Sequence, residues 1–239
     1  MGSLLGTFII TTTIRPVRIL ERGASKEEAD FVVIWYHGFG ADGRDCAPIA
    51  DVLREMGVSN RIRYLFPEAD QRPCEIVDVL GNPPSWYDYV SWFPTVKVPE
   101  TVDQAIRGVL ETVDDVVKSG IPVERIVLAG FSQGGALAVD TAVTSNLPFA
   151  GVIALSCDFP LLYPSRVSRA FDMFFGHGTA DPMVPLAWKS ESVAELRGAG
   201  HRVTERHYHG LGHGIAREEL RDVAQYLTAL HRRALGIED

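Results

Sequence analysis

Residues 125–143 decide the fold, and they read RIVLAGFSQGGALAVDTAV. Residues 126–129 have the apolar, β-branched character of a buried strand, and residues 135–143 have the apolar spacing of a helix. Between them, Ser132 has a glycine two residues away on each side, which is how a serine is presented on a sharp turn from strand to helix. A side chain at either glycine would collide with backbone in such a turn. The stretch therefore predicts a strand–turn–helix unit with Ser132 as a candidate nucleophile.

The rest of the chain repeats this alternation of strand and helix. Apolar runs rich in β-branched residues predict strands at 31–36, 62–66, 126–129, 152–155, 171–175 and 203–208. Apolar residues at three-to-four spacing predict helices at 46–55, 102–117, 135–143, 186–197 and 218–234. We therefore expect an α/β fold with a mostly parallel sheet and helices on both of its faces. Residues 8–14 and 17–21 are expected to add strands at one edge.

Length and charge limit the possible classes of protein. A chain of 239 residues with 46% apolar and 23% charged residues is ordinary for a globular protein, and we expect residues 1–239 to form a single domain. The net charge of −8, without a cluster of Lys and Arg, argues against nucleic acid or an anionic membrane surface as a partner. No apolar run is long enough for an integral membrane segment.

The cysteines indicate a reducing location. Cys46, Cys74 and Cys157 are few and dispersed, and no Cys-x-x-Cys pair suggests zinc or redox chemistry. We therefore expect a cytoplasmic protein without a disulfide framework.

A serine nucleophile needs a histidine that accepts its proton. His213 lies in a glycine-rich loop between the last predicted strand and the last predicted helix, at the sheet edge where Ser132 is expected. His213 is therefore the predicted base. His207 and His209 alternate along the preceding strand and are expected to be structural. A metal site formed by these three histidines is the alternative, although their spacing fits a strand end better.

Two further histidines and a carboxylate complete the set of candidates. His37 and His177 each follow an apolar strand and precede a glycine, and we expect them to support loops through hydrogen bonds.

The carboxylate that orients the base is either Asp181 or Asp158, because both follow predicted strands between the serine and the histidine. We choose Asp181, which lies in a turn-rich stretch after its strand, whereas Asp158 has an apolar context.

Acyl transfer also needs two donors for the oxyanion, normally backbone amides. The amide of Gln133 supplies the first, because it follows the nucleophile at the start of a helix whose dipole adds positive potential. The second is expected in the loop after an early strand, where His37-Gly38-Phe39-Gly40 has small residues that let backbone approach a substrate. Phe39 is the expected donor.

Together these motifs resemble the acyl-protein thioesterase and carboxylesterase family of α/β-hydrolases. The motifs that carry the resemblance are His37-Gly38-Phe39-Gly40, Pro84-Ser85-Trp86-Tyr87-Asp88, Gly130-Phe131-Ser132-Gln133-Gly134-Gly135, Leu155-Ser156-Cys157, His177-Gly178 with Asp181-Pro182-Met183-Val184-Pro185, and Gly212-His213. The resemblance implies a catalytic triad of Ser132, Asp181 and His213, and an oxyanion hole at the amides of Phe39 and Gln133. The family often has leucine at the position of Phe39, and a larger side chain there is expected to narrow the acyl entrance.

The segment 72–99 interrupts the alternation with prolines and aromatic residues and is expected to be a long functional loop. The resemblance implies that Trp86 and Tyr87, together with Phe39, border the substrate pocket. Trp92 and Phe93 have two equal interpretations, pocket lining or core packing, and exposed aromatics around Trp92 would support a weak homodimer. The interval between the strands at 152–155 and 171–175 is too short for a cap domain, so we expect an open site.

The sequence thus predicts a serine hydrolase that cleaves carboxylic esters or thioesters through an acyl-enzyme, without metal or organic cofactor. The expected substrates are acyl esters or thioesters, including S-acylated proteins and lysophospholipids. One alternative is a small-ester or dienelactone-type hydrolase with the same triad and a shorter pocket. An alternative of another class is a non-catalytic binding protein on this fold.

Overall fold

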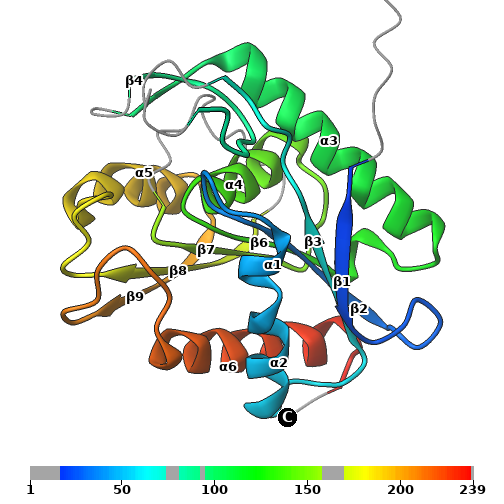
Figure 1. The fold of residues 1–239 in the computed structure, drawn as a ribbon. Coiled ribbons are helices and arrows are strands. Elements are labelled where there is room, and N and C mark those ends of the chain that lie inside the picture. The colour runs from blue at the N-terminus through cyan, green and yellow to red at the C-terminus, as the bar shows by residue number, and fades with distance from the viewer. Residues whose placement is uncertain (1–16, 74–80, 92–94, 158–169, 238–239) are drawn as a thin grey trace, which may run out of the picture.

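A seven-stranded sheet forms the centre of the molecule in the computed structural model, which describes residues 17–73, 81–91, 95–157 and 170–237 (Figure 1). The strand order is β1-β3-β2-β6-β7-β8-β9. All neighbouring strands are parallel except β1 and β3, so the predicted mostly parallel sheet is confirmed. The strands are β1 (Ile19–Gly23), β2 (Phe31–Tyr36), β3 (Ile62–Pro67), β6 (Ile126–Phe131), β7 (Gly151–Leu155), β8 (Asp172–Gly178) and β9 (Arg202–Tyr208).

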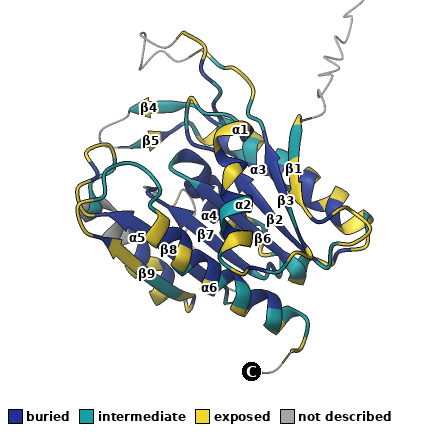
Figure 2. Ribbon diagram, turned by 60° about the horizontal axis from the view of Figure 1, so that its bottom comes forward, coloured by how far each residue is buried: buried dark blue, intermediate teal, exposed yellow. Residues whose placement is uncertain are grey.

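Helices cover both faces of this sheet, as predicted. Side chains alternate across a strand, so Val32 and Ile34 of β2 face one helical layer while Phe31 and Val33 face the other. The first layer contains α3 (Pro99–Lys118), α4 (Gln133–Ser145) and α5 (Leu186–Gly198); the second contains α1 (Gly43–Cys46), α2 (Pro48–Glu55) and α6 (Arg217–Ala234). Figure 2 shows the central strands buried between these layers.

Two segments differ from the prediction. The helix expected at 46–55 is divided into α1 and α2, because Pro48 has no N–H to continue a helix and instead begins α2. The expected loop at 72–99 contains a separate two-stranded antiparallel sheet of β4 (Tyr89–Ser91) and β5 (Val96–Lys97). Its β-branched and aromatic residues favour strand pairing, although the two strands are too short to show alternation in the sequence.

The edges of the sheet and the domain organisation follow the sequence only in part. The predicted edge strand at 17–21 is β1, which begins at Ile19, whereas the predicted strand at 8–14 lies outside the described residues. In the described part of the interval between β7 and β8 no cap domain is present, and 158–169 lie outside it. No helix among the described residues is both long and apolar enough to cross a membrane. That residues 1–239 form one domain stays a prediction.

The strand order determines where loops meet. After β2 the chain adds β3 on one side of β2, and it later adds β6 on the other side. The direction in which successive strands extend the sheet therefore changes between β2 and β6. These strands are parallel and in register, with Tyr36 opposite Gly130. The loop after β2 and the turn after β6 therefore leave the sheet side by side. Such a switch point is where open α/β sheets bind their ligands.

Candidate active site

Ser132 lies on the sharp turn between β6 and α4 that the sequence predicts. Its backbone has φ 52° and ψ −122°, a conformation that residues with side chains rarely adopt. A Cβ at Gly130 would lie 2.3 Å from the Gly134 carbonyl carbon, and one at Gly134 would lie 2.2 Å from the Tyr36 oxygen. The Ser132 N–H donates to the Leu155 oxygen at 2.8 Å, which ties the turn to the end of β7. The two glycines thus allow the turn, and β7 holds it.

His213 brings a ring nitrogen to the serine hydroxyl. The loop after β9 places His213 Nε2 3.1 Å from Ser132 Oγ, and Nδ1 lies 2.8 Å from Asp181 Oδ2. The imidazole packs against the ring of Phe131, with 4.8 Å between the ring centres. A proton on Nδ1 donates to the carboxylate and leaves Nε2 as an acceptor for the serine hydroxyl. The structure therefore brings the three predicted triad residues together.

Asp181 is held by backbone donors as well as by the histidine. Its Oδ1 accepts the N–H groups of Met183 and Val184, each at 2.9 Å, so Oδ2 is directed toward His213. His177 supports the same turn, because its Nε2 donates to the Val184 carbonyl at 2.8 Å. The predicted loop-supporting role of His177 is confirmed. The alternative acid, Asp158, lies outside the described residues.

The loop after β2 lies beside the nucleophile. Gln133 is the first residue of α4, and the first N–H groups of a helix have no acceptor within that helix. In the β2 loop, His37 Nδ1 donates to the Gly38 carbonyl at 2.8 Å and Nε2 accepts the Ala69 N–H at 3.1 Å. Burial lowers the pKa of His37 and favours its neutral form. His37 therefore supports the loop, as predicted.

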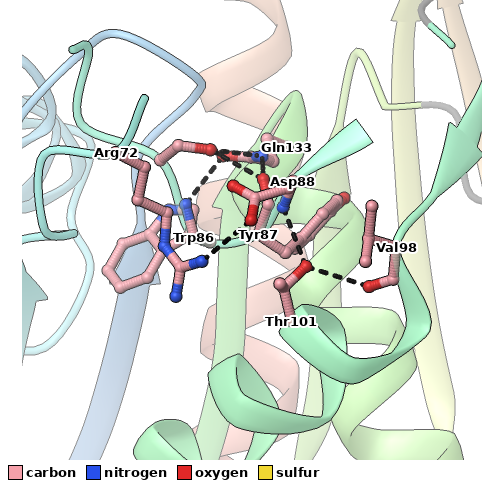
Figure 3. Close-up of polar contacts among 8 residues, drawn as sticks. Arg72, Trp86, Tyr87, Asp88, Val98, Thr101 and Gln133 are labelled. Atoms are coloured by element: carbon pink, nitrogen blue, oxygen red, sulfur yellow. Dashed lines mark hydrogen bonds and ion pairs between the residues drawn. The ribbon is translucent and has the colours of Figure 1, made fainter. Parts of the chain in front are cut away.

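The side chain of Gln133 fastens the aromatic segment to the nucleophile turn (Figure 3). Its Oε1 accepts the Trp86 N–H at 3.0 Å, and its Nε2 donates to the Tyr87 carbonyl at 2.8 Å and to Ser85 Oγ at 3.0 Å. The indole N–H of Trp86 donates in turn to the His37 carbonyl at 2.8 Å. The aromatic segment, the β2 loop and the serine turn are thus one hydrogen-bonded unit.

The pocket at Ser132 differs in part from the predicted substrate contacts. It is lined by Phe39, Tyr89, Thr95, Ser132, Gln133, Met183, Val184 and His213. Of the three predicted substrate contacts, Phe39 lines it. The prediction for Tyr87 needs correction, because its side chain is fully buried in the core and offers no surface to a substrate. Trp86 is partly buried against that core and is absent from the pocket lining, where it supports the β2 loop instead.

Four lining residues were not identified from the sequence. Met183 and Val184 follow the acid directly, and this proximity is a usable signal. Tyr89 lies two residues after Tyr87 in an extended segment, and nothing in the sequence shows which of the two reaches the pocket. Nothing in the sequence indicates that Thr95 lines the pocket. Trp92 and Phe93, for which pocket lining and core packing were both open, lie outside the described residues.

Comparison with known proteins identifies the family. The model of the phospholipase/carboxylesterase family matches residues 20–231. The chain belongs to this family. This confirms the resemblance inferred from the motifs, and the chain is a hydrolase of the carboxylesterase type on an α/β-hydrolase fold.

Individual relatives in the phospholipase/carboxylesterase family match along most of their length. Acyl-protein thioesterase 1 of Cryptococcus neoformans is 30% identical over 224 residues, covering 84% of this chain and 93% of the relative. Acyl-protein thioesterase 1 of Kluyveromyces lactis is 26% identical over 226 residues, covering 89% and 97%. The crystal structure of SOBER1 from Arabidopsis thaliana has a TM-score of 0.72 at 25% identity, covering 86% of this chain and 99% of that one.

His207 and His209, the other two histidines of the alternative metal site, are not among the residues that line the pocket. His207 is on β9, with Nε2 3.7 Å from Glu205 Oε1, and His209 follows that strand. Among the residues that the structure describes, no three His, Cys, Asp or Glu side chains are grouped to hold a metal ion.

Proposed function

We propose that this protein hydrolyses carboxylic esters and thioesters through an acyl-enzyme on Ser132. The observation that carries the proposal is a chain of two hydrogen bonds. Ser132 Oγ lies 3.1 Å from His213 Nε2, and His213 Nδ1 lies 2.8 Å from Asp181 Oδ2. Membership of the phospholipase/carboxylesterase family supports the reaction class. A non-catalytic binding protein would not need this alignment on a strained serine turn.

The proposed reaction has two stages. His213 Nε2 accepts the proton of Ser132 while Oγ attacks the carbonyl carbon, and the amides of Phe39 and Gln133 donate to the oxyanion. Collapse of the tetrahedral intermediate breaks the bond to the leaving group, which takes the proton from His213. Water then gives a proton to His213 Nε2 and attacks the acyl carbon. The bond between the acyl carbon and Ser132 Oγ breaks, His213 returns the proton to Oγ, and the carboxylic acid leaves. Throughout, Asp181 keeps His213 in the tautomer that carries a proton on Nδ1. No step needs a metal or organic cofactor.

The proposed substrates are acyl thioesters and esters, with S-acylated proteins and lysophospholipids as the two physiological classes. The names of the relatives, acyl-protein thioesterase 1, support the thioester. The proposed location is the cytoplasm, and a weak homodimer is proposed from the aromatic segment around Trp92. Chain-length profiling with acyl thioesters and lysophospholipids would distinguish the substrate classes, and analytical ultracentrifugation would detect the dimer.

A short-acyl ester hydrolase is the second candidate, and one contact favours it. Phe39 and Tyr89 both line the pocket, and their rings meet edge to face with 6.5 Å between their centres. Such a pair limits the width available to a long chain. Acetyl and palmitoyl thioesters, compared at equal concentration below the critical micelle concentration, separate the two candidates.

The decisive experiment is Ser132→Ala with a chromogenic acetyl ester and a fluorophosphonate probe. We expect a loss of turnover of roughly 10³-fold or more and no labelling, because the nucleophile is absent. Ser59→Ala is the matched control, since Ser59 precedes the amino-terminal end of β3, whereas Ser132 follows the carboxyl end of the parallel strand β6, and the variant should keep both signals. Retained turnover in Ser132→Ala would disprove the serine mechanism, and absence of labelling in the wild-type protein would favour a binding protein.

A further inference from the structure

One wall of the pocket comes from a hairpin outside the main sheet. Tyr89 begins β4 and Thr95 directly precedes β5, and among the residues that the structure describes these two strands pair only with each other. The pairing is short and irregular between Tyr89 and Ser91. An isolated two-stranded hairpin is marginally stable in water. The position of this wall therefore depends on contacts between the hairpin and the rest of the molecule.

One such contact is a buried ion pair that the proposed reaction does not use. Lys97 Nζ of β5 lies 2.6 Å from Asp140 Oδ2 of α4, with side-chain exposures of 0% and 4%. The same ammonium lies over the ring of Tyr87 at 5.5 Å from its centre. Tyr87 and Val139, which directly precedes Asp140 in α4, belong to the apolar core. Two charges thus meet in an apolar environment beneath the hairpin.

Asp140 and Gln133 lie on the same side of α4. They are seven residues apart, which is about two turns of an α-helix. Gln133 binds the backbone of residues 85–87, and Asp140 binds Lys97 at the other end of the same segment. The base of the hairpin is closed by the Val98 N–H, which donates to the Asp88 carbonyl at 2.9 Å. Thr101 Oγ1 also joins these two residues, because it accepts the Asp88 N–H and donates to the Val98 carbonyl, each at 2.9 Å (Figure 3). The segment that carries the pocket wall is therefore fastened at both ends to the helix that begins beside Ser132.

We infer that Lys97 and Asp140 form a positioning pair that fixes the wall of Tyr89 and Thr95 relative to Ser132, and so determines which acyl groups fit. The inference rests on the proposed function, because it assigns a specificity role within the same pocket. Neither residue lines the pocket, so the pair acts through the hairpin and not by touching the substrate.

The cost of burying the pair supports a role beyond stability. Burial raises the pKa of Asp140 in spite of the adjacent Lys97, which shows how poorly its charge is solvated. Apolar residues of similar volume would fill this site at equal or greater stability. Apolar packing is not directional, however. A contact at 2.6 Å between Lys97 Nζ and Asp140 Oδ2 instead fixes the position of β5 along α4. The ion pair therefore specifies a position that apolar packing would leave variable.

The test replaces both charges at once by Lys97→Met with Asp140→Leu. The double variant should unfold at a temperature close to that of the wild-type protein, because no charge is left buried alone. Turnover of p-nitrophenyl octanoate, whose longer chain should contact the wall, should fall about tenfold in kcat/KM, mainly through KM, while acetate hydrolysis should fall by less than about twofold. A purely structural role would lower both rates together or change neither.

The control is Lys118→Met with Asp114→Leu, which removes an exposed pair on α3 and should leave the chain-length profile unchanged. An unchanged octanoate-to-acetate ratio in the Lys97/Asp140 double variant overturns the inference. If that variant does not fold, Lys97→Gln with Asp140→Asn decides, because it keeps the volumes and a hydrogen bond, leaves no charge buried alone and weakens the attraction, and should lower the ratio about threefold. Fluorophosphonate labelling of Ser132 in the wild-type protein separates a failure of this inference from a failure of the proposed function.

Discussion

Replacing Gly134 by alanine should inactivate the protein more than it destabilises it. A Cβ at this position would lie 2.2 Å from the Tyr36 oxygen and 2.5 Å from the His37 oxygen, whereas real Cβ atoms stay at least 3.0 Å from such neighbours. The start of α4 must therefore move away from β2 by about 0.8 Å, the difference from the 2.2 Å contact. The same helix start carries Ser132, so the shift is transmitted to the nucleophile.

The size of the effect follows from the hydrogen bond at the nucleophile. His213 Nε2 and Ser132 Oγ are 3.1 Å apart, near the upper limit for an effective bond, so a shift of this size is enough to break it. A misplacement of about 1 Å typically costs about 100-fold in rate. Overpacking costs about 1–3 kcal/mol of unfolding free energy, which leaves the protein folded at assay temperature. The assay is kcat/KM for p-nitrophenyl acetate, together with the rate of fluorophosphonate labelling and the thermal midpoint.

Gly108→Ala is the matched control, because a Cβ there meets nothing within 4 Å. This residue lies inside α3, where alanine should raise the unfolding free energy by up to about 1 kcal/mol and leave kcat/KM unchanged. If Gly134→Ala keeps kcat/KM within about tenfold of the wild-type value, the turn is not constrained by these carbonyls and the reasoning is wrong.

Two further predictions concern the acid and a buried histidine. In Asp181→Asn, the N–H groups of Met183 and Val184 should hold the amide oxygen, so the amide nitrogen faces His213 and favours its wrong tautomer. We expect kcat to fall about 10⁴-fold with an unchanged thermal midpoint, and a fall of less than tenfold would contradict this role. Burial lowers the pKa of His37 below 6.5, so the unfolded chain binds a proton that the folded protein does not. Stability should therefore decrease as pH falls below about 6.5, by up to about 1.4 kcal/mol per pH unit for this group, and denaturant unfolding of His37→Asn should show a smaller slope.

The elements that the sequence predicts best are those with a local physical reason. The turn at Ser132 needs glycine on both sides, and the loops of Asp181 and His213 directly follow the strands β8 and β9. These constraints act within a few residues of chain, so they are visible as motifs. The structure joins the side chains of Ser132, His213 and Asp181 by hydrogen bonds, as the order of these residues in the chain predicts.

Contacts between distant segments were not predictable in the same way. Tyr87 and Tyr89 have the same chemistry and the same parity along an extended segment, and only packing decides that Tyr87 is buried in the core. Lys97 and Asp140 are 43 residues apart, and each alone looks like an ordinary polar residue. The break before Pro48 is an exception, because its cause is local and was available in the sequence.

The position of β9 has a consequence for how the protein fails on heating. Within the described part of the chain this strand pairs only with β8, at the edge of the sheet, and has mostly exposed or half-buried residues. In contrast, β6 lies between two strands and is almost entirely buried. His213 follows β9, and Ser132 follows β6. Local opening requires least free energy where few apolar contacts are broken. We therefore expect the base to separate from the nucleophile in partially open states whose core is intact, so that reversible thermal inactivation should begin below the temperature of global unfolding.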